Sequence, residues 1–69
     1  MATFSERLLE LRTERGLSQA AAAAQIGITS RTYQRYESGE REAAISALVS
    51  MADLFGVSID YLVGRSDSR

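Results

Sequence analysis

Five glycines divide this chain into segments, and each glycine follows a run of residues in which apolar side chains recur with helical spacing. They stand at positions 16, 27, 39, 56 and 64. Glycine enters the left-handed backbone conformation without strain, so it is the residue that most often ends an α-helix. The 69 residues contain no proline, and the β-branched residues never alternate as they do in a strand. The pattern predicts an all-α chain of five helices.

Capping residues predict where most of these helices begin. Thr3 opens a capping box with Glu6, in which each side chain accepts a backbone N–H of the other residue. The other expected N-caps are Ser18, Thr29 and Ser58. The expected helices cover approximately residues 4–15, 19–25, 30–37, 45–55 and 59–63.

The composition excludes several classes of protein. The chain has no Cys and no His, which removes disulfides and the common zinc sites. We find no phosphate-binding glycine loop and no spaced acidic cluster that could run catalysis. With 45% hydrophobic residues but no apolar run near the roughly 20 residues that span a bilayer, and no signal peptide, the chain is typical of one small globular domain over residues 1–69. We expect a soluble cytoplasmic protein that is not an enzyme and needs no cofactor or metal.

Two of the short predicted helices are joined by "IGIT", which is typical of a helix-turn-helix motif. On the second helix, Arg31 and Arg35 lie about 40° apart on one face, whereas Tyr33 and Tyr36 lie about 60° apart on nearly the opposite face. Gln34 flanks the arginines. Arginine pairs bidentately with guanine, and glutamine with adenine, in the major groove. A solvated arginine face on an ordinary core helix fits the same spacing, so this helix alone leaves both interpretations open.

Three stretches in order resemble the Cro and repressor-type helix-turn-helix family of phages and bacterial regulators, also called the xenobiotic-response-element family. They are "LRTERGLSQ" (11–19), "GITSRTYQRYESGERE" (27–42) and "LVSMADLFGVSIDYLVG" (48–64). The resemblance covers about residues 4–64 and implies a compact five-helix, lambda-repressor-like domain, with residues 65–69 as a tail that we expect to fray. It also implies a sequence-specific transcriptional regulator, a repressor, that binds double-stranded DNA through its third helix.

Positions that match the family's motif supply the candidate DNA-binding residues. They are Gln19, Ser30, Arg31, Gln34, Arg35, Ser38 and Arg41. The resemblance implies that Gln19 holds the DNA backbone, that Arg31 and Arg35 address bases, and that the loop after the third helix contacts phosphate. Structural alternatives remain for Gln19 as a plain first-turn residue, for Ser30 as a support of the first turn and for Arg41 as a solvated charge.

One further pair of matching positions has an implied structural role. Arg12 and Glu37 correspond to a charge pair that, in relatives, holds the first helix against the end of the recognition helix. If the pair is partly buried, removing one partner costs several kcal/mol because the other charge is left unpaired. Two unrelated surface charges are the alternative interpretation.

The chain departs from the family's pattern in three respects. The family usually has Glu and Leu where this chain has Ala21 and Ala22, and a smaller aliphatic residue where it has Tyr33. We hypothesise that the small Ala22 opposite the large Tyr33 conserves core volume. Ala43 and Ala44 replace the usual Pro and capping Ser or Thr, so we expect the fourth helix to begin late or to fray. The net charge of −1 predicts weak non-specific attraction to DNA, so affinity must come from a few directed contacts and from dimerisation.

Dimerisation is expected because one module touches only one half-site. Useful affinity needs two copies about 34–36 Å apart, on a palindromic operator. Candidates for a self-complementary apolar patch are Leu54, Val57, Ile59 and Val63, although Leu54 also fits a role in the core. An antitoxin-like module, whose main role is to bind a protein partner, is the alternative function.

Overall fold

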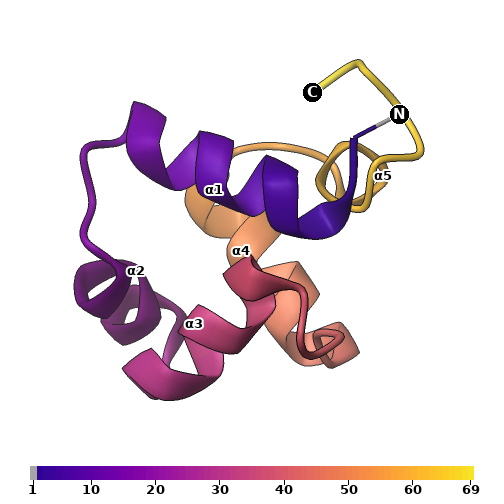
Figure 1. Ribbon diagram of the computed structural model, residues 1–69. Coiled ribbons are helices and arrows are strands. Elements are labelled where there is room, and N and C mark those ends of the chain that lie inside the picture. The colour runs from indigo at the N-terminus through magenta and orange to yellow at the C-terminus, as the bar shows by residue number, and fades with distance from the viewer. Residues whose placement is uncertain (1) are drawn as a thin grey trace.

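All five predicted helices are present in the computed structural model, which describes residues 2–69 (Figure 1). They are α1 (Phe4–Glu14), α2 (Gln19–Ile26), α3 (Ser30–Ser38), α4 (Ile45–Phe55) and α5 (Ile59–Leu62). No strand occurs within residues 2–69, and none of the described helices is long and apolar enough for a membrane crossing. The all-α prediction is confirmed. α1 and α5 end one residue earlier than expected, and α2 and α3 end one residue later.

Capping at the helix ends follows the predicted pattern. The Glu6 N–H donates to Thr3 Oγ1 at 3.3 Å, and the Thr3 N–H donates to Glu6 Oε1 at 2.9 Å, so both halves of the capping box form. All five glycines have positive φ angles, between 64° and 87°. α4 begins at Ile45, but Ala44 before it provides no side-chain hydrogen bond. The absence of that cap costs about 1 kcal/mol relative to a Ser or Thr.

The helices enclose a single core. α3 packs on α1 and α2, α4 packs on α2 and α5, and α5 packs on α1. In Figure 1, α1 runs across the top of the view, α2 and α3 lie below it, and α5 lies beside the beginning of α1. The largest side chains that are fully enclosed are Leu8, Tyr33, Met51 and Leu62.

A buried cation holds α5 against α1. Arg7 is only 6% exposed, and its guanidinium carbon lies 3.8 Å from the ring centroid of Tyr61. The Tyr61 hydroxyl donates to Glu10 at 2.6 Å, and this hydrogen bond holds the pKa of Glu10 below its ordinary value. The stacked ring and the hydrogen bond therefore attach the short α5 to the longer α1.

Two residues of the segment 65–69 contact α1. Arg69 forms ion pairs with Glu10 and Glu14, and Asp67 accepts a hydrogen bond from Arg7 at 2.8 Å. The side chains of Arg69 and its two partners are close to half exposed, and exposed ion pairs contribute about 0–1 kcal/mol each. Fraying of this tail stays a prediction.

Ala22 and Tyr33 are both 0% exposed. A larger side chain at position 22 therefore cannot turn outward into solvent. We expect Ala22→Leu to lower the free energy of unfolding by about 1–3 kcal/mol, because overpacking forces side chains out of their rotamers. Thermal melting followed by circular dichroism measures the change. Ala24→Leu is the control, because Ala24 is exposed on the same helix. A more stable Ala22→Leu variant would count against the volume-compensation hypothesis.

Candidate DNA-binding surface

An ion pair joins α1 to the end of α3. Arg12 Nε donates to Glu37 Oε2 at 2.6 Å, and Arg12 Nη2 donates to Glu37 Oε1 at 3.1 Å. The remaining Arg12 nitrogen, Nη1, donates to the Leu17 carbonyl in the loop before α2 at 2.9 Å. Gln19, the first residue of α2, donates its amide to Glu37 Oε1 at 3.1 Å. One carboxylate therefore connects three helices.

Burial and hydrogen bonding shift the pKa of Glu37 in opposite directions. Its side chain is 6% exposed and that of Arg12 is 15% exposed. Burial raises the pKa of the Glu37 carboxyl, but the hydrogen bonds from Arg12 and Gln19 outweigh burial and hold this pKa below its ordinary value of 4.5. The hydroxyl of Tyr33 is buried without a hydrogen-bond partner in residues 2–69, and burial together with the Glu37 carboxylate raises the pKa of Tyr33. Glu37 is thus ionised and paired inside the fold.

The two faces of α3 differ in chemistry, as its residue spacing predicts. Tyr33 and Tyr36 are 0% and 3% exposed, and the Tyr36 ring packs edge-on against Phe4 with the centroids 6.2 Å apart. Arg31 is exposed on the other face. The two tyrosines are therefore core residues that support α3, and the polar face is presented to solvent.

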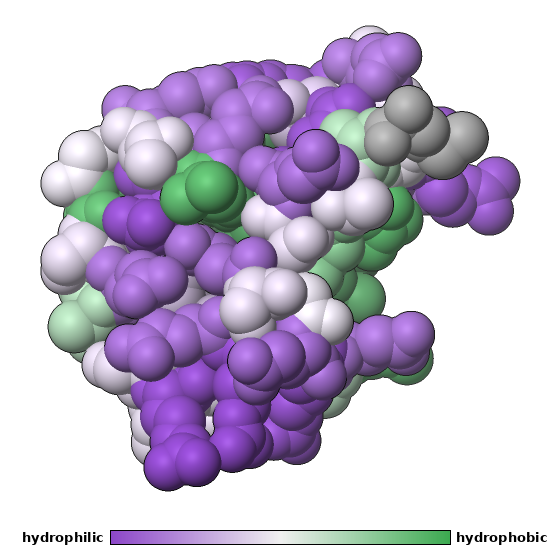
Figure 2. All heavy atoms as spheres, viewed as in Figure 1, coloured by the Kyte–Doolittle hydropathy of each residue, from purple (hydrophilic) through white to green (hydrophobic). Residues whose placement is uncertain are grey.

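The polar face of α3 contains an open hollow of about 320 Å³. Its lining residues are Arg31, Gln34, Arg35, Ser38 and Glu40. Figure 2 shows hydrophilic side chains gathered at the lower end of the molecule, where α3 lies in Figure 1. The structure thus brings together four of the seven predicted DNA-binding residues. Arginine forks and an amide on one helix face are the groups that bind base edges in the major groove.

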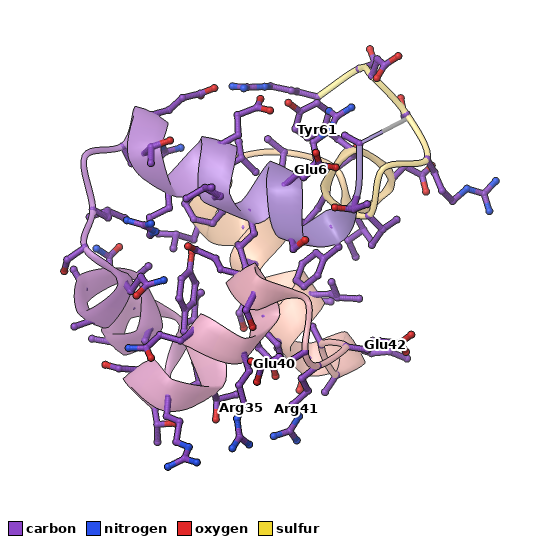
Figure 3. The ribbon with its side chains drawn as sticks, viewed as in Figure 1. Glu6, Arg35, Glu40, Arg41, Glu42 and Tyr61 are labelled. Carbon is purple, nitrogen blue, oxygen red and sulfur yellow. The ribbon has the colours of Figure 1, made fainter. Side chains whose placement is uncertain are left out.

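The other three predicted contact residues lie outside the lining of this hollow. Gln19 is half-buried, and its amide already donates to Glu37. Ser30 is the half-buried first residue of α3. Arg41 is exposed and lines a neighbouring hollow of about 290 Å³, and Figure 3 shows it directed to the same side of the molecule as Arg35. DNA contact by all seven residues stays a prediction.

The arginines of this surface are not neutralised by the protein. Within residues 2–69, every ion pair involves Arg7, Arg12 or Arg69, so Arg31, Arg35 and Arg41 form none. Guanidinium groups without a protein partner are free to bind phosphate or base oxygens.

Sequence reasoning missed two charged residues. Glu40 lines the hollow because Gly39, with φ of 81°, turns the chain back over the end of α3, where the Glu40 N–H donates to the Arg35 carbonyl at 3.0 Å. The helix-ending glycine was the available signal, since this hydrogen bond accompanies such an end. Arg7 gave no signal, because its contacts are with Tyr61 and Asp67, which are distant in the sequence.

Comparison with known proteins identifies the family. A model of the helix-turn-helix family (HTH_3) matches residues 8–62. The chain belongs to the helix-turn-helix family. It is 41% identical over 64 residues to the HTH-type transcriptional regulator AnsR of Bacillus subtilis strain 168, covering 93% of this chain and 55% of that protein. It is 43% identical over 62 residues to the cryptic phage CTXphi transcriptional repressor RstR of Vibrio cholerae, covering 90% of this chain and 55% of the repressor.

The helix-turn-helix chain spans about half the length of these curated relatives. Its fold matches the P22 c2 repressor crystallised with a synthetic operator, with a TM-score of 0.89 and 23% identity over 96% of this chain and all of that one. The predicted lambda-repressor-like fold is confirmed. The names of these two relatives agree with the predicted class, a transcriptional regulator, and do not favour the antitoxin-like alternative.

The Arg12–Glu37 pair provides a test of what holds α3 in place. We expect Glu37→Gln to lower the free energy of unfolding at pH 7 by about 3 kcal/mol, because Arg12 keeps a buried charge without its counter-charge. The pKa of Glu37 is lowered by folding, so its stabilisation is complete above pH 4.5 and is lost as the pH falls through the folded value. Urea unfolding of both proteins across this range measures the difference.

The double variant Arg12→Met/Glu37→Gln is the control for this experiment. It removes both charges and should therefore be more stable than Glu37→Gln alone. A stability difference between parent and Glu37→Gln that persists undiminished in acid would contradict the assigned role of the carboxylate.

Proposed function

We propose that this chain is a sequence-specific DNA-binding transcriptional regulator that inserts α3 into the major groove and represses transcription by occluding its operator. The observation that carries the proposal is the hollow on α3, where Arg31, Gln34 and Arg35 converge. The arginines there are free of ion pairs in the described chain. Such a surface suits the acceptors of guanine and adenine in the groove.

The contact residues have distinct roles in this proposal. Arg31 and Arg35 address guanine edges, and Gln34 addresses adenine, because these pairings satisfy two hydrogen bonds at once. Ser38, the last residue of α3, and Arg41, in the loop after α3, contact phosphate. The first-turn residue Ser30 and the α2 residue Gln19 complete the contacts to the DNA backbone; Gln19 is positioned by its hydrogen bond to Glu37.

We also propose that the protein acts as a homodimer on a palindromic operator, in the cytoplasm, where it has access to DNA. Of the four apolar residues expected to form a patch, Val57 is buried in the core and Leu54 packs against the core. Val63 is half-buried. Ile59, at the beginning of α5, is 40% exposed. The proposed dimer contact therefore centres on Ile59.

Arg35→Ala tests base contact. Selection from a random duplex library first defines the preferred sequence of the parent. We expect the variant to bind that sequence about 1–3 kcal/mol more weakly and to lose preference at one position of each half-site, because a bidentate pair is removed. Arg65→Ala is the matched control, since Arg65 is exposed in the segment after α5 and also forms no ion pair in residues 2–69. If Arg35→Ala weakens binding equally on all DNA sequences, Arg35 contacts phosphate and not a base.

Ile59→Asp tests the dimer. A charge at this apolar contact should shift the protein toward monomer in analytical ultracentrifugation and weaken binding to a two-half-site duplex at least tenfold, because desolvating an unpaired carboxylate is costly. Binding to a single half-site should not change. Leu9→Asp is the control, since Leu9 is similarly exposed, at 45%, but lies on α1. If Ile59→Asp self-associates as strongly as the parent protein, Ile59 is not part of the dimer interface.

A further inference from the structure

One acidic side chain lies within the hollow that the proposed function assigns to DNA. Glu40 lines it together with Arg31, Gln34, Arg35 and Ser38. Glu40 is exposed, and in Figure 3 it lies in the same region as Arg35, beyond the end of α3. Neither the family resemblance nor the relatives assign it a role.

The position of Glu40 is set by the backbone. Its N–H donates to the Arg35 carbonyl at 3.0 Å, and the Gly39 N–H donates to the Tyr36 carbonyl at 3.3 Å. Gly39 provides the left-handed conformation, with φ of 81°, that this pair of hydrogen bonds requires. Glu40, two residues beyond the end of α3, is thus anchored through its backbone beside the hollow that the arginines line.

The carboxylate of Glu40 has no cation of its own. No ion pair of Glu40 occurs within residues 2–69, although Arg31 and Arg35 line the same hollow. It therefore differs from Glu37, whose charge is paired with Arg12 inside the fold. A DNA duplex that docks on α3 therefore meets the Glu40 carboxylate, which can only accept hydrogen bonds, beside arginine side chains that can only donate them.

An ionised carboxylate has few favourable partners on DNA. Phosphate oxygens repel it, and DNA carries one such charge about every 1.7 Å along its axis. The acceptors of guanine and the O4 of thymine offer it no hydrogen. The exocyclic amino groups, N4 of cytosine and N6 of adenine, are the donors in the major groove, and glutamate accepts from cytosine N4.

We propose that Glu40 is a specificity-determining residue that accepts a hydrogen bond from an exocyclic base amino group in the cognate register and repels phosphate in other registers. This inference rests on the proposed function, because it requires α3 in the major groove. It explains how an acidic residue is compatible with a DNA-binding hollow. The carboxylate weakens binding to arbitrary sequence more than binding to the operator.

The test uses the parent and Glu40→Gln in the random-duplex selection, followed by binding to the selected and to random-sequence duplexes. Glutamine has the same shape without the charge. If Glu40 accepts from cytosine N4, we expect the variant to lose preference for cytosine at one position of each half-site, by about tenfold, because the uncharged amide is a weaker acceptor. If Glu40 accepts from adenine N6, we expect a stronger preference for adenine at that position, because an amide pairs with adenine through two hydrogen bonds. The affinity of the variant for random-sequence duplex should rise about threefold at low salt, because the variant lacks the carboxylate charge that DNA phosphates repel.

Glu42→Gln is the matched control. It makes the same change in net charge two residues away, and Glu42 is also exposed and without an ion pair in the described residues. Glu42 lines the hollows around Phe4 and not the one on α3, and Figure 3 shows it directed to another side. This control should retain the sequence preference of the parent.

Two results would overturn the inference while leaving the proposed function intact. Equal tightening of both variants with an unchanged sequence preference would mean that Glu40 acts only through net charge. A Glu40→Gln profile and affinity identical to those of the parent would place Glu40 outside the interface. In either case the parent still selects a sequence and Arg35→Ala still weakens binding. A parent that selects no sequence would instead contradict the proposed function itself.

Discussion

The candidate DNA-binding surface depends on one buried carboxylate. Glu37 accepts hydrogen bonds from Nε and Nη2 of Arg12 on α1 and from the amide of Gln19 on α2, so the end of α3 is fixed relative to both helices. The net stability that such a pair provides is modest, because desolvation offsets much of the attraction. Its geometry is demanding, however, since four nitrogen–oxygen contacts, including the one to the Leu17 carbonyl, must form together. The pair therefore contributes orientation more than energy, and orientation is what a helix entering a groove requires.

Overall charge is a poor guide to what DNA would meet on this protein. The chain has a net charge of −1. The negative charge of Glu37, however, is paired with Arg12 inside the fold, and Glu10 and Glu14 of α1 form ion pairs with Arg69. The side of α3 that faces solvent presents Arg31 and Arg35 without protein partners among the described residues. At physiological ionic strength, charges separated by more than about 8 Å are largely screened. The local arrangement therefore governs docking, and the distant acids matter little.

The helices and the faces of α3 were predictable because their causes are local. A cap such as Thr3 and a glycine such as Gly39 act within one turn, and a period of 3.6 residues separates Tyr33 from Arg31 without knowledge of the partners. Arg12 and Glu37 could be paired only through the family resemblance, since 25 residues separate them. The contacts of Arg7 are with Tyr61 and with Asp67, 60 residues away, and no local pattern encodes such a contact. The place of Glu40 in the hollow was not predicted for a reason that is partly local. Its backbone hydrogen bond to Arg35 is local, but tertiary packing decides which face of α3 is exposed to solvent.

In the proposed complex, a small domain must discriminate among DNA sequences with few side chains. The buried tyrosines and the Glu37 pair fix the backbone of α3, so the entropy lost on binding is confined mainly to the exposed side chains. In the proposed complex, Arg31 and Arg35 contribute where a guanine or a phosphate meets them, and the small number of such contacts limits the affinity for competing sequences. In our proposal, Glu40, which forms no ion pair within residues 2–69, adds to this discrimination because its carboxylate lowers the affinity wherever no base amino group is present. Under this proposal, specificity depends on penalties as well as on contacts, and the penalty comes from one local carboxylate and not from the net charge of the chain.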